Sequence, residues 1–123
     1  MQAINKALFE RVKACTLCPV YDSVPDNKKM PYIALADTEL TPWNTKTTAG
    51  LAVTAGILLY SDYKGDKQIN EMADAVMGLF DKAPLNLGEG LPVVKQQLEA
   101  LKIDRLDGFR EGFIKITIKI HKR

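Results

Sequence analysis

The stretch FIKITIKIH, residues 113–121, decides the fold class. Its four isoleucines, at positions 114, 116, 118 and 120, alternate with Lys, Thr, Lys and His. Successive side chains of a strand point to opposite faces, so this period of two predicts a strand with one apolar face and one polar face. A sheet that is buried on one face needs a second layer, which the rest of the sequence has to supply.

Working outward from this strand, LAVTAGILLYS at residues 51–61 predicts a second and stronger one. Its odd positions, from Leu51 to Leu59, are all apolar, whereas its even positions are a mixed set that includes Leu58 and Tyr60. We therefore expect one of its faces to pack against another layer and the other face to be partly available.

A third strand is expected over residues 32–40, separated by turn residues from a brief strand at Val20–Tyr21. Alternation would divide the side chains of the third strand between two faces: Tyr32, Ala34 and Ala36 on one, and Ile33, Leu35, Asp37 and Glu39 on the other. The two acidic residues indicate that the second half of this strand leaves the core.

A helix is expected over residues 2–14, because Ile4, Leu8 and Val12 recur every four residues. Pro19 prevents it from continuing.

A second helix is expected over residues 67–82, with Asp66 available as its cap and Pro84 to end it. Its apolar residues recur at helical spacing and predict a buried stripe of Ile69, Met72, Ala73, Val76, Leu79 and Phe80.

Residues 93–106 leave two interpretations open. Val94, Leu98 and Leu101 have helical spacing, and the segment is rich in helix-forming residues. Alternation in its second half also permits a strand that closes the sheet. Residues 107–112 then predict a turn, because they contain Asp107 and two glycines. The order of elements predicts one α+β domain over residues 1–123, a mainly antiparallel sheet with two helices packed on one face.

The composition describes an ordinary globular chain. It has 123 residues, 46% hydrophobic and 26% charged, with 17 basic and 15 acidic side chains. This length predicts a single domain, and the balanced charge gives no reason to expect a specific nucleic-acid partner. The N-terminus is charged throughout and unlike a signal peptide, and no apolar run has the length of a membrane span, so we expect a cytoplasmic origin and no membrane partner.

The search for reactive side chains predicts no enzyme, no catalytic residue, no metal and no cofactor. Cys15 and Cys18 form a CxxC, but this pair follows a helix instead of opening one, and zinc would need further ligands. The single histidine, His121, alternates with Lys119 on a polar face and is expected to be solvated. GEG at residues 88–90 lacks the spacing of a phosphate-binding loop.

Interface residues are the remaining candidates. Trp43 and Phe109 lie in connections where burial within one small domain is not assured, and Leu58 and Tyr60 lie on the available face of their strand. The alternative is that the rings fold back over the sheet. The candidate set is Trp43, Thr45, Lys46, Leu58, Tyr60, Phe109 and Arg110.

The segment VYDSVPDNKKMPYIALAD, residues 20–37, resembles the tail-terminator or tail-completion proteins of long-tailed phages, which join tail to head. The residues that carry this similarity have the pattern V-Y-D-x-V-P…P-Y and are Val20, Tyr21, Asp22, Val24, Pro25, Pro31 and Tyr32. The similarity continues in ADAVMGLF at residues 73–80 and in the turn before the final strand. CTLC at the helix exit departs from this family's pattern.

The resemblance implies a structural virion protein, encoded by a phage or prophage. Proteins of this family end growth of the tail tube as a ring, usually of six subunits, at the head-proximal end. The implied partners are other copies of the chain, the major tail-tube protein and a head-closure or connector protein, with assembly in the bacterial host cytoplasm.

Three other hypotheses stay open from the sequence. The chain could be another neck or minor tail protein, such as a head-closure or adaptor subunit. It could be a small thiol-redox protein built on Cys15 and Cys18. It could also be a small-molecule binding domain with an apolar pocket on the uncovered sheet face.

Overall fold

The computed structural model describes residues 2–15, 17–23, 29–44, 46, 49–82, 85, 87 and 92–121. The described elements are α1 (Gln2–Lys13), β1 (Val20–Tyr21), β2 (Tyr32–Pro42), β3 (Gly50–Ser61), α2 (Lys67–Lys82), β4 (Val93–Leu106) and β5 (Phe109–His121). They confirm the α+β class and the mainly antiparallel sheet. Neither of these helices is long and apolar enough to cross a membrane.

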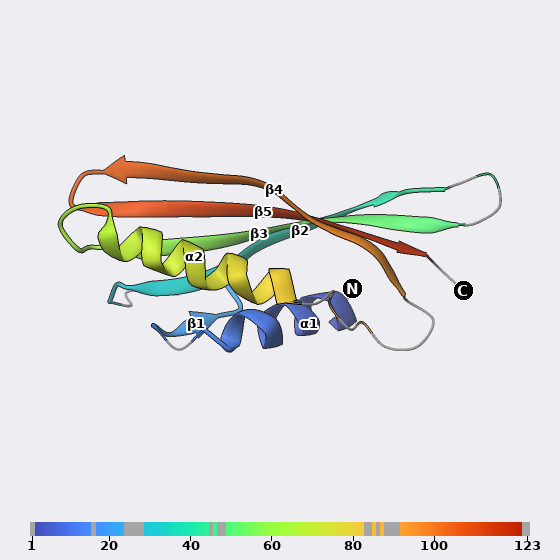
Figure 1. The fold of residues 1–123 in the computed structure, drawn as a ribbon, viewed down its shortest axis with the longest axis horizontal. Helices are drawn as coiled ribbons and strands as arrows, with labels where there is room; N and C mark the ends of the chain where they lie inside the picture. Colours follow the sequence, from blue (N-terminus) through green and yellow to red (C-terminus); the bar gives the residue numbers. More distant parts are fainter. Residues whose placement is uncertain are drawn as a thin grey trace.

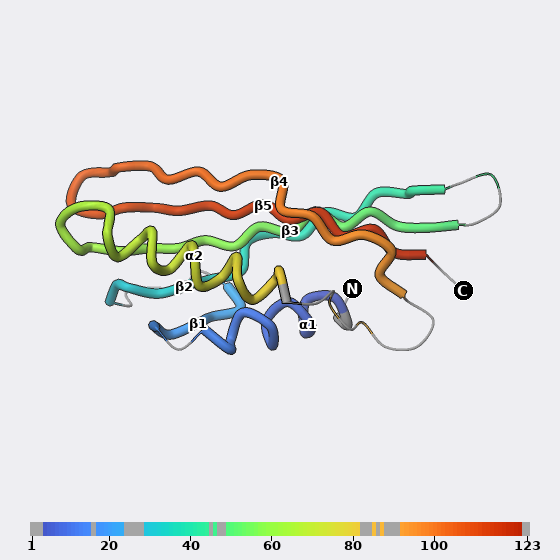
Figure 2. The backbone as a smooth tube through the Cα atoms, in the orientation of Figure 1, coloured from blue at the N-terminus to red at the C-terminus, as the bar shows by residue number. Residues whose placement is uncertain are grey.

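The five strands form one sheet in the order β1-β2-β3-β5-β4 (Figure 1). β1 runs parallel to β2, and the other three pairs are antiparallel. β4 lies at one margin of the sheet and follows β5 along its length, as the backbone trace in Figure 2 shows. The far ends of β2 and β3 extend beyond both helices (Figure 1).

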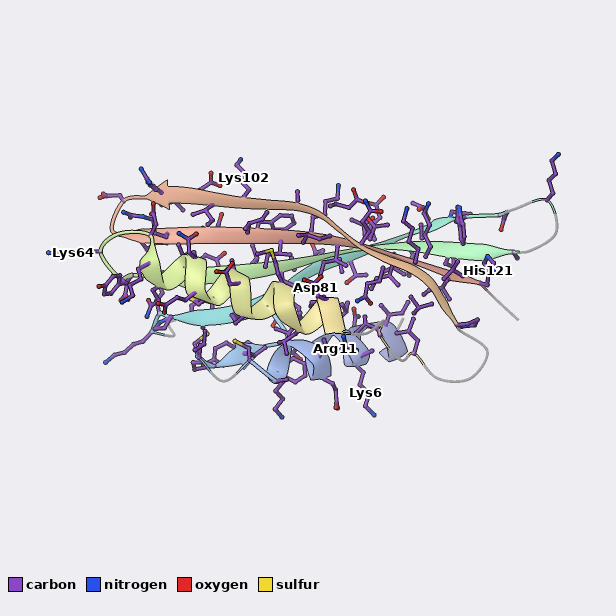
Figure 3. The ribbon with its side chains drawn as sticks, viewed as in Figure 1. Lys6, Arg11, Lys64, Asp81, Lys102 and His121 are labelled. Carbon is purple, nitrogen blue, oxygen red and sulfur yellow. The ribbon has the colours of Figure 1, made fainter. Side chains whose placement is uncertain are left out.

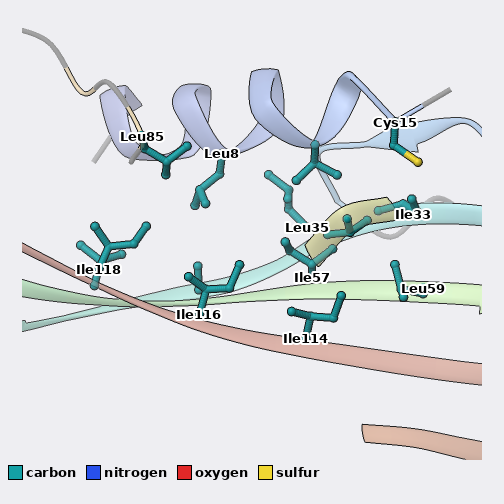
Figure 4. Packing of buried hydrophobic residues seen from close by; sticks show 14 of the residues in the cluster. Leu8, Cys15, Ile33, Leu35, Ile57, Leu59, Leu85, Ile114, Ile116 and Ile118 are labelled. Atoms are coloured by element: carbon teal, nitrogen blue, oxygen red, sulfur yellow. The ribbon is translucent and has the colours of Figure 1, made fainter. Parts of the chain in front are cut away.

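One continuous buried cluster joins the sheet to both helices. It contains the even-numbered residues of β5 from Ile114 to Ile120 and the odd-numbered residues of β3 from Val53 to Leu59. The alternation in these two strands is therefore confirmed. Figure 4 shows Leu8 of α1 directed toward the side chains of the sheet. α2 packs over β3 and β5, whereas α1 lies beside α2 and β1.

Both predicted helical stripes are confirmed. Ile4, Leu8 and Val12 of α1 are at most 4% exposed. The α2 stripe is buried from Ile69 to Val76 and half-buried at its last two members.

The end of α1 is joined to the end of α2 by Arg11. Its Nη1 donates a hydrogen bond to the carbonyl of Leu79 at 2.9 Å, and its guanidinium lies 5.9 Å from the centre of the Phe80 ring. A cation is favourable there, because the last carbonyls of a helix carry partial negative charge.

The sequence left residues 93–106 between helix and strand, and the structure shows the strand β4. Its backbone pairs with β5 over the whole length, which satisfies hydrogen-bonding groups that β5 would otherwise expose. Helix propensity is a weak preference that such tertiary pairing overrides. Gln96 also ties β4 to α2, since its Nε2 donates to the carbonyl of Phe80 at 2.9 Å.

β2 departs from the predicted alternation. Its register against β3 shifts between Leu35 and Thr38. Because one extra residue reverses the faces that follow, Leu40 joins the side of the buried cluster, and Glu39 lies opposite Thr54 on the other side. Placing Glu39 on the same face as Leu35 was therefore wrong.

The predicted turn at residues 107–112 is shorter in the structure. Only Asp107 and Gly108 form it, and β5 already begins at Phe109 and includes Gly112. Gly108 has a φ of 83°, which a two-residue hairpin turn requires and which glycine adopts without steric cost.

Candidate interaction surfaces

Four aromatic rings, those of Tyr21, Tyr32, Tyr60 and Phe109, form a row across the sheet. They lie on the face opposite the buried cluster, which we call the second face. This face carries Tyr32, Leu58, Tyr60, Phe109 and Phe113. The ring centres of Tyr21 and Tyr32 are 5.9 Å apart, those of Tyr32 and Tyr60 4.9 Å, and those of Tyr60 and Phe109 6.3 Å. The row therefore crosses β1, β2, β3 and β5, and it contains two of the interface candidates, Tyr60 and Phe109.

Tyr60 is the polar centre of this row. Its hydroxyl is hydrogen-bonded to Glu111, the residue opposite it on β5. Burial, followed by this hydrogen bond and the negative charge of Glu111, raises the pKa of Tyr60 to about 12. Tyr60 is therefore a neutral hydrogen-bonding group at physiological pH.

Leu58 and Phe113 continue the second face toward the middle of the sheet. They are direct partners on β3 and β5, and both are half-buried. The Phe113 ring lies against Gly56, where an added Cβ would be 2.7 Å from Phe113 Cε2 and 3.0 Å from Ala36 Cβ. Gly56 thus provides the space for this ring, a role that the sequence alone does not reveal.

Trp43 lies at the other end of the second face. Its ring stacks on His121 with centres 5.2 Å apart, and Lys119 Nζ lies 5.1 Å from the indole centre. Gly50 makes this possible, because a Cβ there would collide with the Trp43 backbone carbonyl and lie 2.9 Å from Trp43 Cε3. Trp43 thus folds back over the sheet end and stays half-buried.

His121 differs from the solvated side chain that the sequence predicts. It is half-buried beneath Trp43, and its buried Nε2 has no hydrogen-bond partner in the described part of the chain. Its ring packs against the Trp43 indole.

Arg110 and Phe109 point to opposite faces of β5, because they are successive residues of a strand. Arg110 Nε donates to Asp66 Oδ1 at 3.0 Å, and Arg105 of β4 donates to the other carboxylate oxygen. These hydrogen bonds lower the pKa of Asp66 from its usual value, with Arg105 as the largest cause. Asp66 lies at the start of α2, where its carbonyl accepts a hydrogen bond from the Asn70 amide. Its side chain binds these two arginines, one from β5 and one from β4.

Two interface candidates remain, Thr45 and Lys46. Lys46 is exposed. Thr45 lies outside the described residues.

The two cysteines are free thiols. Cys15 belongs to the buried cluster, and Cys18 is half-buried. Burial, with a smaller contribution from Cys15, raises the pKa of Cys18 to about 11. A redox nucleophile needs the opposite shift, because the thiolate is the reactive form. Within the described ranges, no three His, Cys, Asp or Glu side chains are grouped to hold a metal ion.

The described residues thus present half-buried aromatic side chains on the second face of the sheet. The chain belongs to the family described as tail completion protein gp17, whose model matches residues 2–121. This family is one of phage tail-completion proteins, which are virion components and not enzymes. The family resemblance drawn from residues 20–37 is thereby confirmed.

Two solved structures share the fold. One is a chain from the "Virion of native gene transfer agent (GTA) particle", with a TM-score of 0.82 and 22% identity over 98% of this chain and 96% of that chain. The other is the gp17 protein of bacteriophage SPP1, with a TM-score of 0.63 and 20% identity over 95% and 88% of the two chains. No curated protein sequence matches this chain.

Proposed function

We propose that this protein ends tail-tube polymerisation as a homo-oligomeric ring of six subunits at the head-proximal end of a phage tail. Each subunit contributes a single domain in which both helices cover one face of the sheet. The second face then remains for contact with neighbouring virion proteins. The ring also provides the surface to which the head joins.

The observation that carries this proposal is the aromatic row on the second face. Tyr21, Tyr60 and Phe109 are all half-buried, although they lie on a sheet that has a complete buried cluster on its other face. Partly exposed aromatic groups that gather on one face are typical of protein interfaces. Membership of the tail-completion family supplies the kind of partner.

The proposed partners are other copies of the chain, the major tail-tube protein, and a head-closure or connector protein. In this account the protein is encoded by a phage or prophage and assembles in the cytoplasm of the bacterial host. The free subunit associates weakly, because a terminator has to wait until the tube has reached its length.

Trp43 provides the test. Because its indole is stacked on the sheet end but lies outside the buried cluster, Trp43→Ala should leave the subunit folded and weaken capping of the tube. Tyr63→Ala is the matched control, since Tyr63 is 51% exposed in the turn before α2 and lies beside Lys67 and Glu71 of that helix, away from the second face.

The assay measures the length of tail tubes, by electron microscopy, as tube protein polymerises with each variant. We expect wild type and Tyr63→Ala to limit tube length, and Trp43→Ala to require a higher concentration for the same effect. A wild-type protein that leaves tube length unchanged would refute the proposed function. Unfolding of Trp43→Ala would show that the indole serves the core alone.

A further inference from the structure

The sheet has two edges that the described strands leave open. At one margin, β4 pairs with β5 and with no other described strand. At the other margin, β1 covers β2 only at Ile33 and Ala34. Over residues 36–42, none of the described strands pairs with the outer edge of β2. Such edges present unpaired N–H and C=O groups to which another strand can add.

The directions of the strands make these two edges compatible. β2, β3, β5 and β4 alternate in direction across the sheet. A second copy placed beside β4 with its own β2 continues this alternation as an antiparallel pair. Both copies then keep the same orientation, so the buried cluster of each stays on the same side of the extended sheet.

The β4 edge carries most of the exposed large apolar side chains. Of the six such side chains in the described residues, four belong to β4: Val94, Leu98, Leu101 and Leu106. Leu98 lies opposite Ile116 and Leu101 opposite Ile114, so both point to the side of the buried cluster. They nevertheless remain 45% and 38% exposed. Solitary edge strands usually carry charges in such places, so leucines there indicate an edge that is covered.

A groove lies beside the open edge of β2. It has a volume of about 390 Å³ and lies between α1 and β2, with Phe9 and Leu35 among its apolar lining residues. Asp22 and Asp37 also line it, and Lys6 lines it from α1. In Figure 3 the Lys6 side chain extends away from the sheet. Leu35 belongs to the buried cluster, so the groove opens on the same side of the sheet as Leu98 and Leu101.

The β4 edge carries two lysines, of which Lys102 Nζ also lies 3.8 Å from Asp104 Oδ1 of its own strand, and the β2 edge carries acidic side chains. Asp37 and Glu39 on β2 are both exposed. Lys95 and Lys102 on β4 are also exposed, and they lie on the second face, opposite Lys119 and Phe113. Figure 3 shows Lys102 pointing outward from β4. Glu39 lies on this same face, so both charge and face match.

We propose that β4 of one copy adds to residues 36–42 of β2 in the next copy. Leu98 and Leu101 enter the groove over Phe9 and Leu35, and Lys95 and Lys102 meet Glu39 on the second face, while Asp37 at the groove adds to the negative charge of the same edge. The occupant of each edge is a second copy of this chain, and the inference rests on the ring proposed above. Because the two contacting patches differ, the contact is heterologous and closes into a ring when its rotation allows.

The test uses two charge-reversed proteins. Lys95→Glu/Lys102→Glu makes both edges acidic, and Asp37→Lys/Glu39→Lys makes both edges basic. Each protein alone should need a concentration at least ~10-fold higher than wild type to cap tail tubes, since like charges then oppose each other. An equimolar mixture should regain wild-type capping, because acidic and basic edges alternate around the ring.

Lys64→Glu/Lys67→Glu is the control, because it makes the same change of charge at exposed residues away from both edges. Thermal unfolding verifies that each variant folds. If a double variant does not fold, the corresponding single variant, Lys95→Glu or Glu39→Lys, is used in its place.

The outcomes separate this contact from the proposed function. If wild type caps tubes and either edge variant caps them equally well, the strand contact is wrong and the ring stands. If the β4 variant fails while the β2 variant caps normally, the contact is a symmetric pairing of two β4 strands, which also overturns this proposal. If folded wild type never caps tubes, the proposed function fails and this contact with it.

Discussion

Replacing Gly56 with alanine tests how the second face is packed. The new Cβ would lie 2.7 and 2.8 Å from two atoms of the Phe113 ring and 3.0 Å from Ala36 Cβ. Non-bonded carbons prefer about 3.5–4.0 Å. The ring can tilt away, but Ala36 Cβ is fixed to the backbone of β2. We expect overpacking to cost about 1–3 kcal/mol, of which the ordinary advantage of alanine over glycine offsets roughly 0.5–1 kcal/mol.

Gly78→Ala is the matched control, because no heavy atom lies within 4 Å of a Cβ added there in α2. It should stabilise the protein by about 0.5–1 kcal/mol. The same substitution at the two glycines should therefore change the free energy of unfolding in opposite directions. Urea unfolding followed by circular dichroism measures both. In a Phe113→Leu background the cost of Gly56→Ala should fall. A Gly56→Ala protein that is more stable than wild type, as Gly78→Ala is expected to be, would refute the placement of the Phe113 ring over Gly56.

Two further predictions concern titratable groups. Since the pKa of Cys18 rises from 9.0 to about 11, its thiolate at pH 8 should be roughly 100-fold scarcer than in the unfolded chain, and iodoacetamide should alkylate it correspondingly more slowly. Fragmentation mass spectrometry distinguishes Cys18 from Cys15, and rapid alkylation in the folded protein would contradict the assigned burial. The pKa of Tyr60 is raised from 10.0 to about 12, so its contribution to stability is complete below pH 10 and is lost as the pH rises through about 12. Urea unfolding across this range should show a steeper loss for wild type than for Tyr60→Phe, and parallel losses would exclude the effect.

The elements with a strong local period could be predicted from the sequence. Alternation identifies β3 and β5, and four-residue spacing identifies α1, because these patterns depend only on neighbouring residues. The family could also be predicted, from the short motif at residues 20–37.

The remaining features depend on residues far apart in the chain. Leu98 and Leu101 have helical spacing, yet pairing with β5 makes them part of a strand. The register shift after Leu35 reverses the face of Glu39, but the order of apolar and polar residues in β2 does not reveal it. Arg110, one of the interface candidates, binds Asp66, 44 residues away, which no local pattern indicates. The alternation of side chains along β2 does place Tyr32 on the face of Ala34. Together with the alternation along β3, which places Tyr60, it would have indicated part of the aromatic row.

Light scattering measures the mass of the protein with and without tail tubes, and so shows whether rings form only on a tube. We expect the free chain to be monomeric or weakly associated at low concentration, and tubes to collect closed rings of it at one end. A chain that stays monomeric and leaves the tubes unbound would contradict the account, as would one that forms tight rings at nanomolar concentration without any tube.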